Sequence, residues 1–567
     1  MAGMRDYSRG RSRGQLERRS RRDSDLVGLV SCQEGLAVES ATAAMVQWPV
    51  MDDETSSVNE NAAATSWFEK RGVLTKIRQL LSERSGEGYL VGGYVRDLLL
   101  VRFTRDLDLV VAGDAVPLAR ELADRLGGAF VLLDQERHMA RVVLRDGGER
   151  FYVDLATMHS DGLLADLERR DFTVNAMAMD IRDTTPRPEI FDPLGGRLDL
   201  DDRRLRAVSD RAFQEDAIRL LRAVRLSAEL SLQVEGHTEQ LMLRDASLIG
   251  QVSAERVRDE LCQILAASQA EDSLRYLDRL GLLSALLPEL DPLRGLEQPP
   301  PHYQDVFQHS LTVVGALNEV GGALQQMARD ESDLVVLRGG ESERMKGYFV
   351  EALAPYAQRL VAHLDERLAE GRGSAALLKL CGLLHDVGKA NTRTVDEEGR
   401  RRFFGHAREG AAIAAAVARR LRFGNREVRL VQTVVRHHMR PLQLAQVESI
   451  SRRAIYRFFR DTQGGGVDVL LLALGDNLAL LHQGADVEQW RRMCETARLL
   501  LAAYHERYRE VVEPVPLISG GDLLERLGME PGPAVGRILR ALHEAQATGE
   551  VTTTEEALEL VQSLLGE

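Results

Sequence analysis

Two aspartates separated by one apolar residue, Asp106 and Asp108, are the first residues of this sequence whose types and spacing indicate chemistry. Alternate side chains of a β-strand share a face. An LDLVV strand therefore places both carboxylates on one face, with Leu107 and Leu109 on the core side. Two adjacent carboxylates repel each other unless a divalent cation lies between them. The pair therefore predicts a site for a divalent cation.

A glycine pair and an arginine precede this strand. Gly92 and Gly93 lie at a predicted turn, where glycine lets backbone N–H groups approach a phosphate closely. Arg96 follows and can bind phosphate oxygens with its planar guanidinium. Together with Asp106 and Asp108, these residues predict a metal-dependent site for nucleoside triphosphate chemistry.

The combination of GGYVRD with DLD resembles the nucleotidyltransferase superfamily, and within it the tRNA nucleotidyltransferases and bacterial poly(A) polymerases. The resemblance implies that the glycine pair and Arg96 contact the triphosphate, and that Asp106 and Asp108 bind two Mg²⁺ ions. It also implies that Asp154, in RFYVDLAT, is a third catalytic carboxylate. From the residues alone, a solvated or turn-capping aspartate is almost as good an interpretation of Asp154.

Two later segments resemble further motifs of the same family. They are ERRDFTVNAMAMD at 168–180 and FDPLGGRLDLDD at 191–202. The resemblance implies that Arg170 lies near the triphosphate and that Asp171 and Asn175 brace the site.

The segment QEDAIRLLRAVRLSAEL at 214–230 has apolar residues at a helical period. This period predicts that Asp216 and Arg219 lie one turn apart on a shared face, where a surface ion pair is the alternative interpretation. A carboxylate beside a guanidinium complements the hydrogen-bonding edges of cytosine and adenine. The segment resembles the family's EDxxR motif, which implies that Asp216 and Arg219 read the base and that Arg222 and Arg225 line the same face.

A second group of candidate ligands lies further along the chain, where histidines are frequent. Imidazole and carboxylate ligands on several helices suit a transition metal or magnesium. Their order resembles the HD phosphohydrolases, which hydrolyse phosphoesters with a metal-activated water. The resemblance implies a first site for a divalent metal of unknown identity and ligands that can complete a second. The first-site ligands are His309, His385, Asp386 and Asp476, and the second-site ligands are His406 and His437.

Composition limits the remaining possibilities. A chain of 567 residues with 44% hydrophobic and 28% charged residues is typical of a globular protein with three or four domains, and no apolar run is long enough for a membrane helix. The net charge of −14 means that tRNA must be bound by a local basic face. Four widely spaced cysteines favour a reducing compartment, and we expect a cytoplasmic protein. No protein partner and no oligomeric state is predicted.

The first 65 residues differ from the rest. Eight arginines lie between positions 5 and 22, and a small-residue, acidic stretch without periodicity follows. This composition predicts a disordered, arginine-rich leader. A flexible tail or a misassigned start codon is the preferred explanation, with an organellar transit peptide as the alternative.

From residue 66 onward, helix-like and strand-like segments alternate. Residues 66–182 are predicted to form an α+β head, a nucleotidyltransferase-type small mixed sheet with helices. Mostly α-helical regions follow: a neck for base recognition and RNA binding at 183–290, an HD domain at 291–486 and a C-terminal tRNA-binding region at 487–567. In the head we expect helices at 70–81, 95–100 and 116–126, and strands at 89–92, 106–112, 129–134, 139–145 and 150–157.

The function that these resemblances imply is a tRNA nucleotidyltransferase that adds C and A residues to the tRNA 3′ end from CTP and ATP, with an associated HD phosphohydrolase activity. The segment between Asp154 and Arg169 is shorter than in many family members, where it is thought to help switch specificity from C to A. Addition of CC alone, or of A alone, is therefore the main alternative. A poly(A) polymerase, an HD phosphohydrolase with a degenerate head and a non-catalytic RNA-binding protein are weaker alternatives.

Overall fold

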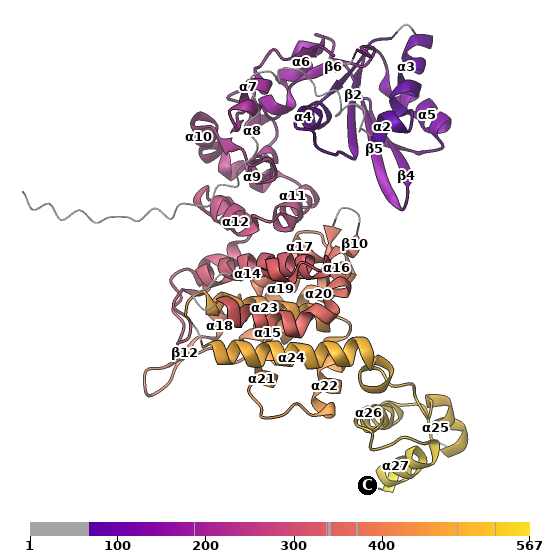
Figure 1. Ribbon diagram of the computed structural model, residues 1–567, viewed down its shortest axis with the longest axis vertical. Coiled ribbons are helices and arrows are strands. Elements are labelled where there is room, and N and C mark those ends of the chain that lie inside the picture. Colours follow the sequence, from indigo (N-terminus) through magenta and orange to yellow (C-terminus); the bar gives the residue numbers. More distant parts are fainter. Residues whose placement is uncertain are drawn as a thin grey trace, which may run out of the picture. The chain divides into compact units, whose positions relative to one another are not determined.

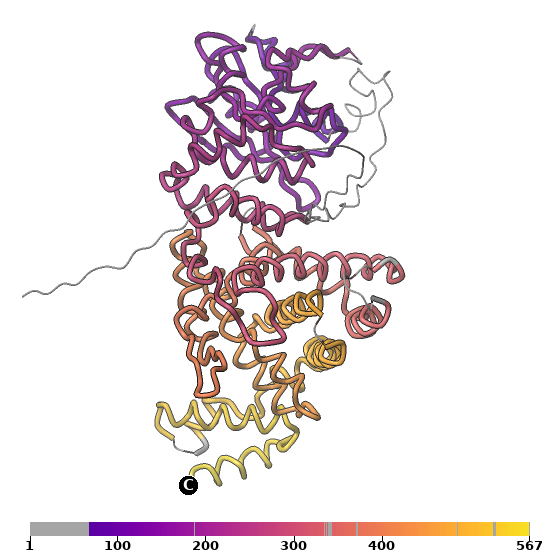
Figure 2. Tube along the Cα trace, turned by 90° about the vertical axis from the view of Figure 1, so that its left-hand side faces the viewer, coloured from indigo at the N-terminus to yellow at the C-terminus, as the bar shows by residue number. Residues whose placement is uncertain are grey.

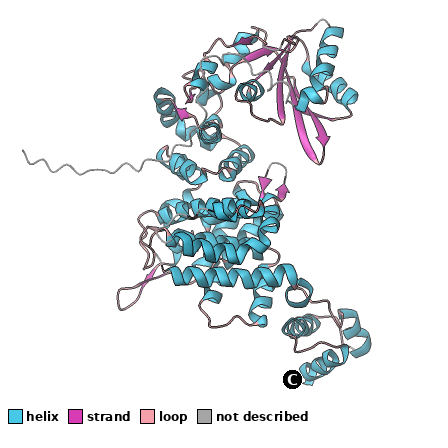
Figure 3. Ribbon diagram, in the orientation of Figure 1, coloured by secondary structure: helices cyan, strands magenta, loops and turns pink. Residues whose placement is uncertain are grey.

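The computed structural model describes residues 67–566, except 85, 186–187, 336, 338–341, 370–371, 485 and 528. The leader predicted at 1–65 lies outside the described residues. Strands are concentrated in the head, and helices make up most of the rest (Figures 1 and 3). The predicted fold class, an α+β head followed by helical domains, is confirmed.

The head contains a seven-stranded sheet in the order β3-β4-β5-β2-β1-β6-β7. Strands β2 and β5 are parallel and every other neighbouring pair is antiparallel, so the sheet is mixed, as predicted. The strands are β1 (Gly88–Val91), β2 (Asp106–Val111), β3 (Ala129–Asp134), β4 (Met139–Asp146), β5 (Glu149–Thr157), β6 (Ala178–Asp180) and β7 (Ile190–Phe191).

One face of this sheet carries the core of the head. Leu107 and Leu109 of β2 are almost completely buried there, as the alternation of the sequence predicts. Helices α3 (Val73–Glu83) and α5 (Ala115–Leu126) cover this face with their apolar sides. At the start of α5 the carboxylate of Asp114 accepts a hydrogen bond from the N–H of Val116 and so caps the helix.

The opposite face is covered at one end only. Val110 of β2 packs there with Leu167 and Ala176 in a small apolar cluster beneath α6 (Leu163–Glu168). Asp106, at the other end of β2, is exposed. The face is therefore open around the two aspartates, where a ligand can reach them.

The neck is helical, and β8 (Arg204–Leu205) pairs with β9 (Gln233–Val234) within it. The continuous helix predicted at 214–230 is wrong at its start: the backbone at Asp216 is extended, with φ −154° and ψ 102°, and a helix begins only at Arg219. The neck helices are α7 (Gly196–Asp201), α8 (Ala212–Glu215), α9 (Arg219–Leu230), α10 (Gly236–Asp245), α11 (Ala254–Ala266), α12 (Ala270–Arg279) and α13 (Leu282–Leu286).

A larger helical body follows, in which α14 (Val306–Ala328) packs against both α17 (Ser374–Leu384) and α23 (Gly466–Leu481). Figure 2 shows its red-to-orange helices gathered together. The other helices of this body include α15 (Ser342–Leu353), α16 (Ala357–Asp365), α18 (Lys389–Thr392), α19 (His406–Arg420), α20 (Asn425–His437), α21 (Arg440–Ala445), α22 (Arg452–Thr462) and α24 (Val487–Glu506).

The last three helices have a separate small core. Ile538 and Leu542 of α26 (Pro533–Thr548) are buried against α25 (Gly520–Leu527) and α27 (Thr554–Gly566).

No single helix in the described part of the chain is long and apolar enough to cross a membrane. Helices α22 and α23 pass that test together by length and composition, but the chain bends by 103° between them.

Candidate active site and metal centre

Three carboxylates lie together on the open face of the head sheet. Asp106 and Asp108 are on β2, and Asp154 on β5 lies opposite Asp108 in the parallel register. Although part of Asp106 is exposed, desolvation by the surrounding protein, followed by the charge of Asp154, raises the pKa of Asp106. Burial also raises the pKa of Asp108 to about 6, although Arg170 acts in the opposite direction. Carboxylate oxygens that repel one another in this way fit a hard divalent cation such as Mg²⁺.

Gly92 is the residue that allows the chain to pass next to these carboxylates. Its φ of +69° lies in the left-handed region, and a Cβ at this position would lie 2.7 Å from Asp108 Oδ2 and from Arg170 Nη1. The following backbone N–H, that of Gly93, hydrogen-bonds to the carboxylate of Asp108. The predicted Gly-Gly turn therefore lies directly against the carboxylate pair and Arg170.

A buried hydrogen-bond network joins the predicted triphosphate residues to the neck. Arg96 Nη1 donates to Asn175 Oδ1 at 2.7 Å, and Asn175 Nδ2 donates to Asp171 Oδ1 at 3.0 Å. Arg222 of α9 donates to Asp171 Oδ2 from Nε at 2.9 Å and from Nη2 at 2.7 Å. Burial would raise the pKa of Asp171, but Arg222 and Asn175 hold it well below its usual range. Asp171 is therefore ionised and fixed between the head and α9.

Arg222 and Arg225 of α9 share an acidic partner. Arg225 Nε donates to Glu260 Oε2 at 2.7 Å, and Arg222 Nη1 lies 3.6 Å from Glu260 Oε1. Glu260, on α11, is itself buried. Glu260 could not be predicted from the sequence, because nothing in its spacing along the chain connects it to α9.

The predicted base-reading pair, Asp216 and Arg219, has other side-chain partners in the structure. Asp216 accepts hydrogen bonds from Arg256 of α11 at 2.6 and 3.1 Å. Arg219 Nη1 donates to Glu215 Oε2 at 3.3 Å and to the carbonyl of Ala212 at 3.0 Å. The prediction that they share a helical face is wrong, because the helix begins after Asp216. Glu215 could have been found from its i,i+4 spacing to Arg219, whereas Arg256 could not.

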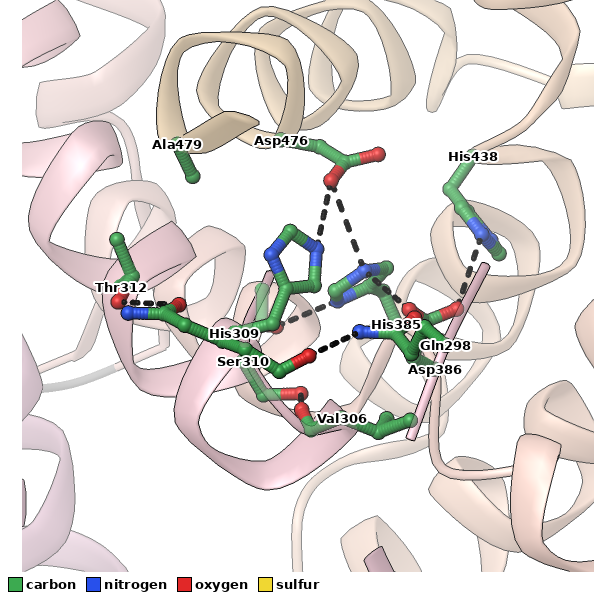
Figure 4. A network of polar contacts seen from close by, with 12 residues as sticks. Gln298, Val306, His309, Ser310, Thr312, His385, Asp386, His438, Asp476 and Ala479 are labelled. Carbon is green, nitrogen blue, oxygen red and sulfur yellow. Dashed lines mark hydrogen bonds and ion pairs between the residues drawn. The ribbon is translucent and has the colours of Figure 1, made fainter. Parts of the chain in front are cut away.

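The second candidate site is in the helical body (Figure 4). His309 Nε2 of α14 lies 2.9 Å from Asp476 Oδ1 of α23, and His385 Nε2 lies 4.0 Å from the same oxygen. One ligand atom from each of these three residues lies within 4.8 Å of the others. Three of the four predicted first-site ligands are thus brought together from three separate segments of the chain.

Asp386 completes the first site and connects it to a second group of imidazoles. Its carboxylate lies 3.1 Å from His385 Nε2, 3.4 Å from His406 Nε2 and 3.8 Å from His438 Nε2. The structure corrects the prediction of His437, which is only half-buried and does not join these residues. Adjacent residues at a helix end point about 100° apart, so only one of the two histidines can face Asp386.

The ring orientations of three histidines suit metal binding. Each Nδ1 lies 2.7–2.9 Å from a main-chain carbonyl three residues earlier. A carbonyl only accepts hydrogen bonds, so Nδ1 must donate and the lone pair of a neutral ring is on Nε2, which faces the cluster. The pairs are His385 with Gly382, His406 with Phe403 and His438 with Val435. This donor set of imidazoles and carboxylates fits a divalent transition metal.

Three further residues line this cluster and were not selected from the sequence. Lys389 Nζ lies 2.6 Å from Asp386 Oδ2 and donates to Gln298 Oε1 at 2.6 Å. Burial would raise the pKa of Asp386, but its interaction with His385 and the charge of Lys389 hold that pKa below its usual range. The ring of His302 lies 4.9 Å from that of His309, and burial lowers the pKa of His302 to about 4.

Comparison with known proteins identifies the family. The poly A polymerase head domain profile matches residues 88–206, the HD domain profile matches 356–461, and the tRNA nucleotidyltransferase domain 2 profile matches 480–561. The CC-adding tRNA nucleotidyltransferase of Thermus thermophilus is 34% identical over 83% of this chain and 92% of that protein. The chain belongs to the tRNA nucleotidyltransferases. It is an enzyme of the nucleotidyltransferase class.

Other members of the tRNA nucleotidyltransferase family give the same result. The A-adding tRNA nucleotidyltransferase of Deinococcus radiodurans is 35% identical over 83% of this chain and 94% of that protein. A solved complex of a CCA-adding enzyme with ATP has a TM-score of 0.52 at 20% identity, covering 90% of this chain and 99% of that one. This likeness confirms the fold of the tRNA nucleotidyltransferase.

Replacing Gly92 tests the close approach of the turn to the carboxylates. Gly92→Ala should lower nucleotide incorporation by about 100-fold, because the added methyl group displaces Asp108 or Arg170. Gly127→Ala is the matched control: Gly127 has a φ of +65° with no atom within 4 Å of a Cβ, so it has similar backbone strain without the clash. Single-turnover incorporation is the measurement, and equal losses in both variants would contradict this role.

The assignment of His438 in place of His437 can be tested by metal titration. His438→Ala should weaken Ni²⁺ binding to the helical body by about 100-fold or more, beyond the cost of losing an outer-shell partner, whereas His437→Ala should leave it unchanged. The titration is calorimetric. It uses protein with Asp106→Asn and Asp108→Asn, so that the head carboxylates do not contribute. The reverse order of effects would show that His437 is the ligand.

Proposed function

We propose that this chain adds cytidine and adenosine residues to the 3′ end of tRNA, taking them from CTP and ATP. The observation that carries the proposal is the open group of Asp106, Asp108 and Asp154 beside the Gly92 turn. In the reaction, the acceptor 3′-oxygen forms a bond to the α-phosphorus of the nucleotide, and the bond from that phosphorus to the pyrophosphate oxygen breaks. Neither step needs a covalent enzyme intermediate.

The residues of the head and neck divide this work. The Gly92–Gly93 backbone, Arg96 and Arg170 hold the triphosphate, and Asp171 and Asn175 keep Arg96 and Arg222 in place. Two Mg²⁺ ions held by Asp106 and Asp108, with Asp154 as a further carboxylate, would activate the 3′-hydroxyl and stabilise the departing pyrophosphate. These fixed charges lie where negative charge develops, and such groups contribute strongly to phosphoryl transfer.

Base selection is assigned to the neck. Asp216 and Arg219 offer an acceptor and a donor to the edges of cytosine and adenine, and Glu215 holds the guanidinium of Arg219. Asp216 must exchange the hydrogen bonds from Arg256 for bonds to the base. Because Asp216 and Arg256 are partly exposed, this exchange carries a small energetic cost.

A specific observation favours a second candidate, in which the chain adds only CC or only A. Four relatives that match more than four fifths of this chain are named for partial addition, three of them CC-adding and one A-adding. The short segment that follows Asp154 folds as the end of β5, a five-residue loop at 158–162 and α6. Leu167 of α6 is completely buried, so this helix is anchored to the head. The segment therefore contains no long loop that could rearrange between the addition of C and the addition of A.

We further propose that the helical body hydrolyses a phosphoester. The support is the convergence of His309, His385, Asp386 and Asp476, extended by His406 and His438, with ring nitrogens directed at one small volume. A divalent metal bound there would supply an activated water for hydrolysis. Lys389 can bind a phosphate oxygen once its contact with Asp386 is released.

A cytoplasmic location is part of this proposal. Cys262, Cys381 and Cys494 are buried free thiols, which is typical of a reducing compartment where CTP, ATP and tRNA are available.

The two activities should be separable by mutation. Asp108→Ala should abolish nucleotide addition, because it removes one of the Mg²⁺ ligands, and should leave hydrolysis of bis-p-nitrophenyl phosphate unchanged. His385→Ala should have the opposite effect. Asp124→Ala removes an exposed aspartate of α5 and should change neither activity. Loss of both activities in either single variant would show that the centres are not independent.

The nucleotides added can be read directly from the product. Purified protein is incubated with tRNA lacking its 3′ end and with CTP, ATP or both, and products are resolved at single-nucleotide length. Full activity gives three added residues when both nucleotides are present. Growth by two residues identifies a CC-adding enzyme, and addition only to tRNA that already ends in CC identifies an A-adding one. Long A tracts would indicate a poly(A) polymerase instead.

A further inference from the structure

A row of charged side chains crosses three neighbouring strands on the open face of the head sheet. Arg141 of β4 lies opposite Asp154 of β5, and Asp154 lies opposite Asp108 of β2. Residues opposite each other on adjacent strands have side chains on the same face, with Cβ atoms about 5 Å apart. Arg141 is therefore the outermost residue of a line that leads directly to the metal-binding carboxylates.

Arg141 is held in this line by two contacts. Its Nε and Nη2 donate to the two carboxylate oxygens of Asp154, each at 2.7 Å. Its guanidinium carbon lies 4.8 Å from the centre of the Tyr152 ring, and Tyr152 lies opposite Asp106. About one third of the Arg141 side chain remains exposed. The guanidinium is thus oriented but still accessible from solvent.

Different residues lie on the two sides of the cluster formed by Asp106, Asp108 and Asp154. The Gly92 turn and Arg170 lie against Asp108 on the β1 side, and Arg96 lies beside Gly93; the proposed function assigns this side to the triphosphate. In phosphoryl transfer, the attacking and leaving oxygens lie on opposite sides of the phosphorus, roughly in line. The acceptor 3′-hydroxyl must therefore reach the carboxylates from the β5 and β4 side, where Arg141 and Tyr152 lie.

We propose that Arg141 binds the phosphate of the terminal nucleotide of the RNA acceptor and so positions the 3′-hydroxyl beside Asp106 and Asp108. A guanidinium binds phosphate oxygens with the same planar geometry that it uses here for the carboxylate of Asp154. When Arg141 turns one or both of its N–H groups to the acceptor phosphate, the oxygens of Asp154 become available to the metal site. Binding of the acceptor would then release Asp154 to act as a metal ligand together with Asp106 and Asp108.

The experiment compares Arg141→Ala and Arg141→Lys with the wild-type enzyme and with Arg145→Ala. Arg145 is on the same strand and face, about 13 Å away at ~3.3 Å per residue, so its loss removes a comparable charge outside the site. KM and kcat are measured separately for tRNA lacking its 3′ end and for the nucleotide. Binding of the same tRNA is measured at several salt concentrations.

Arg141→Ala should raise the KM for tRNA by about tenfold or more, the effect of losing a charge-assisted hydrogen bond, and leave the KM for nucleotide within about twofold. The slope of log Kd against log salt for tRNA should fall by about 0.7–0.9, which corresponds to one phosphate contact. Arg141→Lys should keep the wild-type slope, because it keeps the charge. Arg145→Ala should match the wild type in both KM values.

Two results would overturn the inference. If Arg141 only orients Asp154, Arg141→Ala will lower kcat or raise the KM for nucleotide without changing the salt slope. If Arg141→Ala behaves like Arg145→Ala, the residue has no part in the site. Failure of the proposed function is distinguishable from both, because the wild-type enzyme would then add no nucleotide to tRNA. If Arg141→Ala does not fold, Arg141→Lys still tests the inference, because this variant should keep the wild-type salt slope.

Discussion

Repulsion among Asp106, Asp108 and Asp154 is the constraint on which the head depends. The sheet register fixes these carboxylates next to one another, and the buried leucines on the other side of β2 prevent that strand from turning them away. The protein offsets part of this repulsion with Arg170, with the backbone N–H of Gly93 and with the bidentate contact from Arg141. The repulsion that is not offset favours the binding of a divalent cation between these carboxylates.

The same constraint explains why the neck is joined to the head by buried charges. Asp171 is ionised inside the protein, and loss of its arginine partner would leave a buried carboxylate without a countercharge. Separation of Arg222 from Asp171 is therefore less favourable than separation of Asp216 from Arg256, because Asp171 is buried whereas Asp216 and Arg256 are both partly exposed. The hydrogen-bond network of Arg96, Asn175 and Asp171 is thus joined to α9 through Arg222, and Asp216 can change partners more readily.

Much of the head could be predicted from the sequence, because the alternation of apolar and polar residues in a strand and the glycine pair at a turn can both be recognised within a few consecutive residues. The strand carrying Asp106 and Asp108 and the turn at Gly92 follow from these signals. The interruption at Asp216 was not predicted, because the helical period of the apolar residues continues through it; there the Asp216 carboxylate accepts hydrogen bonds from the N–H of Ile218 and from Arg256. His438 could have been chosen over His437: the buried stripe of Val428, Val431 and Val435 continues at position 438 with helical spacing. The order of ligand residues in a family does not by itself show which of two adjacent histidines is the ligand.

The two candidate sites differ in the residues that surround their carboxylates, and therefore in the cations that they suit. The head combines carboxylates with arginines, which leaves only hard oxygen donors for a cation. The helical body combines carboxylates with imidazoles whose Nδ1 atoms are fixed by carbonyls, and Lys389 provides an internal positive charge beside Asp386. Oxygen-only sites suit Mg²⁺, whereas imidazole-rich sites favour transition metals. The two donor sets therefore differ in kind as well as in place, and they fit different divalent metals.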